Sequence, residues 1–212
     1  MTPVPGYPVV DIHNHMWVAA AREIALEHFS PEKDPRVRFA SAETVAYNRH
    51  VRSRPEVVEH YEDPSVRLRV MDQMGIDMQA LSLGPDQYFY WVEEDLGPRL
   101  SQIQNDHLAE VVAGHPDRFV GLGTLPLQDM PAALTELDRI TGDHRFRGFP
   151  STSVSGRDFD LSEFQPLWRR AEELGILVVL HPYGFDAADR FGEYYMTNVV
   201  AMPRESTIAS AA

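Results

Sequence analysis

The stretch GILVVLHP, residues 175–182, places five consecutive apolar residues between a glycine and a histidine–proline pair. Its valines and isoleucine favour a strand over a helix. A strand that is apolar along its whole length is typical of a parallel sheet, because the connecting helices bury both faces of such a sheet. We therefore expect a buried parallel strand that ends at His181.

Strand-like and helix-like segments alternate along the rest of the chain. The strand-like segments before GILVVLHP are VVDIHNH (9–15), IDMQALSLGP (76–85), FVGLGTLP (119–126) and RFRGFPS (145–151). The helix-like segments lie between them, at residues 65–75, 95–114, 131–140 and 161–174. Gly75 should stop the first of these helices, and Asp129 with Pro131 should start the third.

This alternation predicts an α/β fold with a parallel sheet and helices outside it. Two architectures satisfy the pattern, a (βα)8 barrel of the TIM type and an open doubly wound sheet. No glycine-rich phosphate loop follows the first strand, which argues against an open sheet that binds a nucleotide.

The composition limits the classes of partner and cofactor. A chain of 212 residues with 43% hydrophobic residues is long enough for one globular domain. The net charge of −13 argues against nucleic acid or an anionic membrane surface as a partner. The absence of cysteine excludes disulfides, iron–sulfur clusters and thiolate-bound zinc, so any metal must be held by His, Asp or Glu.

The same sequence indicates a cytoplasmic protein. The first residues, MTPVPGYPVV, lack the basic and apolar regions of a signal peptide. The longest apolar run, ILVVL, is far too short to span a bilayer.

Three histidines are candidate metal ligands. His13 and His15 lie two residues apart at the end of the first strand, so they should project from one face. His181 ends the fifth strand, and the C-terminal strand ends of a βα barrel share one rim. Three neutral imidazoles can hold a divalent ion such as zinc and leave a position open for water. Asp11 shares the predicted face, and three roles are open for it: orienting a ligand, capping, or forming a core hydrogen bond.

Five pieces of the chain carry a family resemblance: DIHNH, DPSVRLRVMDQMGIDMQALS, HPDRFVGLGTLPLQD, AEELGILVVLHP and NVVAMPRES. In these pieces the chain resembles the amidohydrolase-related metal-dependent enzymes grouped around 2-amino-3-carboxymuconate-6-semialdehyde decarboxylase. The resemblance implies a (βα)8 TIM-type barrel, of which about five βα units are present. It also implies one zinc ion with His13, His15 and His181 as ligands, and His181 as a catalytic residue.

The resemblance further implies an arginine that binds the substrate carboxylate, and Arg54 is the best match. A guanidinium suits this role because it can bind both carboxylate oxygens. Arg49 and Arg52 lie close by and are alternatives. Arg54 could equally be a solvent-exposed loop arginine without a functional role.

The function that follows is zinc-dependent, non-oxidative decarboxylation of a small unsaturated or aromatic carboxylic acid. A metal-dependent hydrolase or hydratase that acts on an ester, lactone, amide or unsaturated acid is one alternative. A truncated, catalytically silent binding or assembly module is another. The expected partner is a small carboxylic acid, without nucleic acid or membrane, and a homodimer is left open.

The extent of the chain leads to a further expectation. The resemblance implies a later metal-site histidine and aspartate, and these have no counterpart in the 212 residues. The fourth strand, in GFPSTSVSGRDFD, also lacks a glutamine that the family's best-known decarboxylase has there. We expect residues 1–212 to form a C-terminally incomplete barrel domain. Residues 19–63 would be an insertion over the active-site rim, between the first strand and the first helix.

Overall fold

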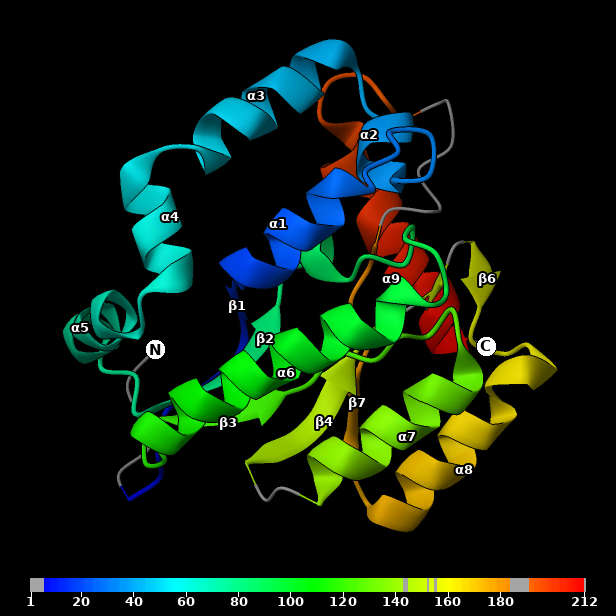
Figure 1. Cartoon of the computed structure of the whole chain (residues 1–212). Helices are drawn as coiled ribbons and strands as arrows, with labels where there is room; N and C mark the ends of the chain where they lie inside the picture. Colours follow the sequence, from blue (N-terminus) through cyan, green and yellow to red (C-terminus); the bar gives the residue numbers. More distant parts are fainter. Residues whose placement is uncertain (1–5, 143–144, 152, 155, 184–190, 212) are drawn as a thin grey trace.

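The computed structural model describes residues 6–142, 145–151, 153–154, 156–183 and 191–211. Within these residues, a five-stranded parallel sheet runs through the molecule in the order β1-β2-β3-β4-β7 (Figure 1). Its strands are β1 (Val10–Met16), β2 (Met78–Leu83), β3 (Phe119–Leu122), β4 (Phe146–Pro150) and β7 (Leu177–Val179). Neighbours in the sheet are also successive along the chain. The order therefore lacks the reversal of an open doubly wound sheet.

The sheet is curled, so that its two outer strands approach each other at their C-terminal ends. Nε2 of His13 on β1 lies 3.2 Å from Nε2 of His181, which follows β7. Yet β1 and β7 occupy opposite ends of the strand order. The prediction of an α/β fold of the TIM-barrel type with five βα units is therefore confirmed.

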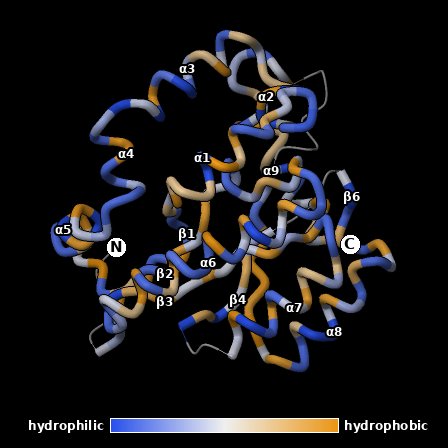
Figure 2. The backbone as a smooth tube through the Cα atoms, in the orientation of Figure 1, coloured by the Kyte–Doolittle hydropathy of each residue, from blue (hydrophilic) through white to orange (hydrophobic). Residues whose placement is uncertain are grey.

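Four helices connect successive strands and cover the outside of the sheet. They are α5 (Pro64–Met74), α6 (Leu96–Gly114), α7 (Met130–Thr141) and α8 (Gln165–Leu174), the last preceded by the 3-10 turn η2 (Ser162–Phe164). Hydrophilic and hydrophobic residues alternate along α6, α7 and α8, as expected for helices with one buried face (Figure 2). None of the helices in the described ranges has the length and apolar character that crossing a bilayer requires.

The predicted ends of two of these helices are confirmed. Gly75 follows α5 with φ 67°, a left-handed conformation that glycine adopts without strain. Asp129 precedes α7, and its side chain accepts a hydrogen bond from the backbone N–H of Ala132. Pro131 lies in the first turn of α7, where its missing N–H needs no partner.

Residues 19–63 are mostly helical, which the sequence did not indicate. The helices are α1 (Ala19–Glu27), α2 (Pro35–Arg38), α3 (Ala42–Arg52) and α4 (Pro55–Glu62). Helix α1 packs beside α6 and α4 contacts β1 and α5, whereas α3 lies farther from the sheet (Figure 1). Neither α3 nor α4 has a buried residue. They therefore lack the apolar stripe from which a helix is predicted.

Three further pieces complete the described chain. The 3-10 turn η1 (Pro85–Gln87) follows β2, and a two-stranded antiparallel hairpin, β5 (Ser153–Val154) and β6 (Arg157–Asp158), follows β4. The hairpin was not predicted, because its strands have two residues each. The π-helical turn η4 (Thr197–Ala201) leads into α9 (Met202–Ala211).

The predicted burial of the fifth strand on both faces is wrong. Leu177 on β7 is 62% exposed and Leu180 is 39% exposed. The first strand behaves alike, with Ile12 66% exposed. Among the described residues β1 and β7 are the two edge strands of the sheet, here called the outer strands, and each pairs with a neighbour on one side only. Burial therefore follows the place of a strand in the sheet, and apolar composition alone does not determine it.

Candidate metal centre

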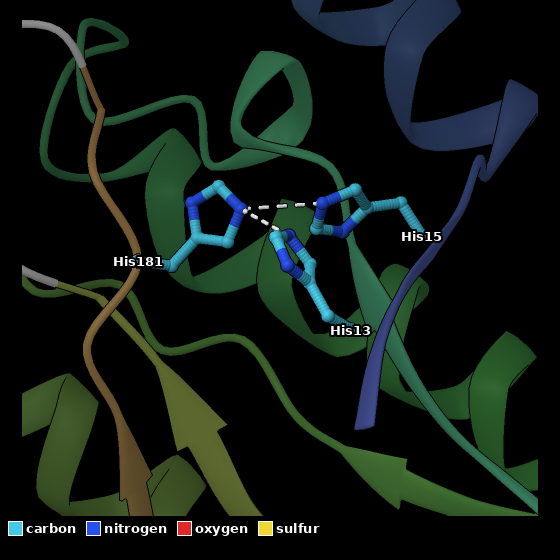
Figure 3. Close-up of side chains that lie close together, drawn as sticks. All are labelled: His13, His15 and His181. Carbon is cyan, nitrogen blue, oxygen red and sulfur yellow. Dashed lines mark hydrogen bonds between the residues drawn. The ribbon is translucent and has the colours of Figure 1, made fainter. Parts of the chain in front are cut away.

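The three predicted histidines lie together at the C-terminal rim of the sheet. Figure 3 shows the imidazoles of His13, His15 and His181 pointing toward one another from β1 and from the end of β7. Their ring centroids are 4.9 to 5.2 Å apart. Nε2 of His181 lies 3.2 Å from Nε2 of His13 and 3.2 Å from Nε2 of His15. One nitrogen of each ring lies within 4.8 Å of the others, as in a metal site.

A β-bulge in β1 shapes this arrangement. Asp11 pairs with Gln79 and Asn14 pairs with Leu81, so three steps along β1 oppose two steps along β2. The extra residue shifts the alternation of side chains across the bulge. Asp11 consequently lies on the face of Gln79, whose amide donates to Asp11 Oδ2 at 2.9 Å. A part-buried hydrogen bond is therefore one of the roles left open for Asp11 that the structure contains, and the regular alternation that would place Asp11 with the imidazoles is wrong.

The hydrogen bonds at Nδ1 fix the tautomers of two rings. Nδ1 of His181 donates to the carbonyl oxygen of Pro182 at 2.9 Å, because a carbonyl can only accept. The Ser82 hydroxyl donates to the carbonyl of Asn14 at 2.9 Å, so Nδ1 of His15, 3.0 Å from Ser82 Oγ, donates to it. The proton of each neutral ring is therefore on Nδ1. Its Nε2 carries a lone pair that points into the cluster.

These lone pairs fit a divalent metal ion. Two unprotonated nitrogens 3.2 Å apart repel each other unless a proton or a cation lies between them. Zinc–nitrogen bonds of about 2.0–2.1 Å in a tetrahedral site separate the ligand nitrogens by about 3.3–3.4 Å. The observed separations are close to this value. The contacts of His15 with Ser82 and of His181 with Pro182 are also those that orient metal-binding imidazoles in proteins.

The electrostatic surroundings keep the rings neutral. Burial, followed by the neighbouring imidazoles of His181 and His13, lowers the pKa of His15 from 6.5 to about 4, against an opposing effect of Asp86. Burial also lowers the pKa of His181. Both rings are therefore neutral at pH 7 and have the protonation state that a metal ligand needs.

Aromatic side chains form a wall beside His181. The ring of Tyr88, after η1, meets the His181 ring edge-on with centroids 6.3 Å apart, and it contacts the rings of Tyr90 and Tyr183. Burial raises the pKa of the Tyr88 hydroxyl well above its ordinary value, so this hydroxyl stays protonated. In the described part of the chain no hydrogen-bond partner faces it. The wall is thus apolar with a buried donor.

The structure separates the arginine candidates from one another. Arg54 lies at the N-terminus of α4, 53% exposed, and its Nε donates to Glu56 at 2.8 Å. No hydrogen bond or ion pair joins it to the three histidines within the described ranges. Arg52, at the end of α3, instead forms an ion pair with Asp86 on η1. The charge of Asp86 acts to raise the pKa of His15. Arg49 is exposed.

Several residues that support the histidines were not predicted. They are Arg67, Gln79 and Ser82, which are 3%, 7% and 4% exposed. One signal was available, because Arg67 lies four residues before the buried Met71 on the inner face of α5. A charged residue on the buried stripe of a helix indicates a specific partner.

The comparisons with known proteins agree with this geometry. The amidohydrolase family model matches residues 10–203. The 2-amino-3-carboxymuconate-6-semialdehyde decarboxylase of Dictyostelium discoideum is 33% identical over 155 residues, which are 73% of this chain and 43% of that protein. The chain therefore spans less than half the length of this curated relative.

Two solved structures have a similar fold. The 5-carboxyvanillate decarboxylase from Sphingomonas paucimobilis matches with a TM-score of 0.79 and 26% identity, over 96% of this chain and 61% of that one. The 5-carboxyvanillate decarboxylase from Novosphingobium aromaticivorans, in complex with manganese and 4-hydroxy-3-methoxy-5-nitrobenzoic acid, matches with a TM-score of 0.77 and 22% identity. That match covers 97% of this chain and 59% of that one, and it shows the fold.

Proposed function

Since this chain belongs to the amidohydrolase family, we propose that its activity is the metal-dependent, non-oxidative decarboxylation of a small unsaturated or aromatic carboxylic acid. The observation that carries the proposal is the convergence of the Nε2 atoms of His13, His15 and His181 at one rim. The names of the relatives support it, because those reported above are decarboxylases of a muconate semialdehyde and of an aromatic acid.

We propose zinc as the metal, with His13, His15 and His181 as its ligands. Nitrogen ligands suit zinc, whereas manganese, present in several related structures, favours oxygen ligands. When bound, the ion would supply Lewis acidity toward the oxygens of the substrate. His181 is proposed as a catalytic residue through its contact with the ion. Its bond to the Pro182 carbonyl keeps Nε2 directed at that position.

Residues 1–212 are proposed as one barrel domain in which residues 19–63 cover the rim. Two observations support this role. Arg52 of α3 forms an ion pair with Asp86 next to the histidines. The ring of Tyr61, at the end of α4, stacks on Trp17 just after β1, with centroids 4.4 Å apart.

Arg54 is the proposed substrate-binding and catalytic arginine, which would hold the carboxylate. Its present partner is the exposed Glu56, and an exposed ion pair contributes little to stability, so Arg54 can exchange this partner for a substrate. Loss of such a clamp costs about 1.5–3 kcal/mol, and Arg54→Ala should lower kcat/KM roughly 10- to 150-fold. Arg49→Ala, at an exposed position, should leave kcat/KM unchanged, and a loss confined to this variant would move the role to Arg49. A loss confined to Arg52→Ala would move the role to Arg52.

Metal content and turnover test the proposed function together. The complete protein, purified without chelator, should contain about one divalent ion per chain and release carbon dioxide from an aromatic or muconate-type acid. His13→Ala and His181→Ala should lose both properties. His50→Ala, at an exposed position on α3, should keep both.

Two results would contradict the proposal. Full metal content in either ligand variant would contradict the proposed metal site. Cleavage of an ester or amide without carbon dioxide release would replace decarboxylation by hydrolysis.

A further inference from the structure

The guanidinium of Arg67 lies against the strand that carries two of the proposed ligands. Arg67 projects from α5 and is 3% exposed. Its Nη2 donates to the backbone carbonyl of His15, and also to that of His60 at 3.3 Å. Its Nη1 donates to Asn14 Oδ1 at 3.2 Å and to Gln79 Oε1 at 3.3 Å. One side chain thus bonds β1, β2 and the end of α4.

These contacts enclose the β-bulge from both sides. Beyond the bulge, Arg67 holds Asn14 and the carbonyl of His15. Before the bulge, Gln79 connects Arg67 to Asp11 Oδ2, and Asp11 Oδ1 accepts from the backbone N–H of His13 at 3.1 Å. The Asn14 amide closes the ring by donating to the Asp11 carbonyl at 3.3 Å. Asp11, His13, Asn14 and His15 are thus connected to this guanidinium, directly or through Gln79 and Asp11.

Burying the charged side chain of Arg67 is energetically unfavourable, so packing alone does not explain why an arginine lies here. Burial lowers its pKa, which shows that the charged form is disfavoured there. Among the described residues no carboxylate forms an ion pair with it, and its Nε has no partner. A methionine would fill the same volume without burying a charge. The presence of arginine is therefore explained by the groups that it bonds.

The bulge needs such a constraint because it is the irregular part of β1. A bulge leaves one residue without a partner in the sheet. If β1 returned to regular pairing, the side chains on one side of the bulge would turn to the opposite face. His13 lies within the bulge, and His15 directly follows Asn14, where regular pairing resumes, so the separation of the two imidazoles depends on the bulge.

We propose that Arg67 is a positioning residue that holds the bulge of β1 and thereby sets the affinity of His13 and His15 for the metal. This inference rests on the proposed metal site, and it assigns a role to a residue that touches neither the ion nor the substrate.

The affinity of the full chain for Co2+, measured by competition with a chelating indicator, tests the proposal. Loss of an outer-shell contact typically weakens metal binding about 10- to 100-fold, and we expect this for Arg67→Met. The absorption spectrum of bound Co2+ should change as well, because the ligand geometry changes. Arg69→Met is the matched control. Arg69 lies on the exposed face of the same helix and bonds only Ser65 Oγ within the described residues, so its variant should bind Co2+ as the wild type does.

Two milder variants keep the test decisive. Arg67→Lys retains the charge but cannot reach four acceptors, so it should bind Co2+ more weakly than the wild type. Asn14→Ala removes one contact of the guanidinium and should weaken binding several-fold, even if Arg67→Met does not fold. A purely structural role would lower the melting temperature and leave the affinity of the folded protein unchanged.

The outcomes separate the two proposals. Unchanged Co2+ affinity and spectrum in folded Arg67→Met, or in Asn14→Ala if Arg67→Met does not fold, would overturn the role of Arg67 while the metal site stands. Failure of the wild-type chain to bind Co2+ would overturn the proposed metal site, and the role of Arg67 with it.

Discussion

On the inner strand β2, every residue from Gln79 to Leu83 is buried, whereas on the outer strands Ile12 is 66% and Leu177 is 62% exposed. The three proposed metal ligands lie on the outer strands or directly after them. His13 and His15 project from β1, and His181 follows β7. The inner strands are stabilised mainly by the apolar area that they remove from water.

The outer strands depend more on specific contacts. On β1, the network of Arg67, Gln79 and Asp11 bonds the backbone around the bulge. On β7, hydrogen bonding to β4 holds the strand on its one paired side. A site built on outer strands therefore gains access to solvent, and it must obtain its geometry from polar contacts. Mutations of the inner and outer strands should therefore affect stability and metal binding differently.

The largest expected effect on stability is at the centre of the sheet. Phe149 on β4 is completely buried, and Phe149→Ala should lower the free energy of unfolding by about 3–5 kcal/mol, because it leaves a cavity. Urea denaturation followed by circular dichroism measures this change. The fraction that remains folded should keep its metal affinity. A loss below about 1 kcal/mol would mean that the inner strands are not the main source of stability.

A second variant tests the connection between the centre and one outer strand. Gly148 on β4 pairs with Leu177, and a Cβ at this position would lie 2.0 Å from the Leu177 carbonyl oxygen. Gly148→Ala should therefore displace β7, lower stability by about 1–3 kcal/mol and weaken metal binding through His181. Isothermal calorimetry with Zn2+ and thermal unfolding measure both effects.

Gly114→Ala is the control, because a Cβ there meets nothing within 4 Å. It should leave stability equal or slightly higher. Intact metal binding in a destabilised Gly148→Ala variant would show that β7 does not position His181 through this pairing.

The third prediction concerns pH and the metal-free protein. Burial and the neighbouring imidazoles lower the pKa of His15 in the folded chain from 6.5 to about 4. Between these two values the unfolded chain binds more protons than the folded chain, so stability should fall as the pH falls from 6.5 toward 4. Above pH 6.5 this histidine should have no effect.

Chemical denaturation with chelator at pH 7.5, 6 and 5 measures the change in stability. In the His15→Gln variant, residue 15 cannot titrate, so the free energy of unfolding should decrease less over the same pH range. The titration of carboxylates lowers the stability of both proteins alike, so the difference between them reports His15. Equal slopes for the two proteins would contradict the burial of His15 in solution.

Much of the fold and the proposed ligands could be predicted from the sequence, for physical reasons that differ by region. The inner strands were recognisable as short, largely apolar segments between helix-like segments, and Gly75 and Asp129 end and begin helices by local chemistry. His13 and His15 were found because two-residue spacing places side chains on one face.

What could not be predicted depends on partners distant in sequence. The bulge exists only relative to the register of β2, and no property of VVDIHNH alone specifies it. The role of Arg67 depends on acceptors contributed by β1, β2 and α4. The exposure of Leu177 depends on the order of the strands. Local patterns therefore predict elements, and the geometry of the site requires their pairing.

The smallest expected effect is at the exposed face of β7. Leu177 is 62% exposed, so Leu177→Thr removes little apolar area from the core, and the β-branched threonine suits a strand. The free energy of unfolding should change by no more than about 0.5 kcal/mol, in contrast with Phe149→Ala. Urea denaturation at two protein concentrations is the measurement. A loss above about 2 kcal/mol that grows with protein concentration would mean that a second copy of the chain covers Leu177. The outer strands would then be buried in the assembled protein. Their greater solvent exposure, compared with the inner strands, would be a property of the isolated chain only.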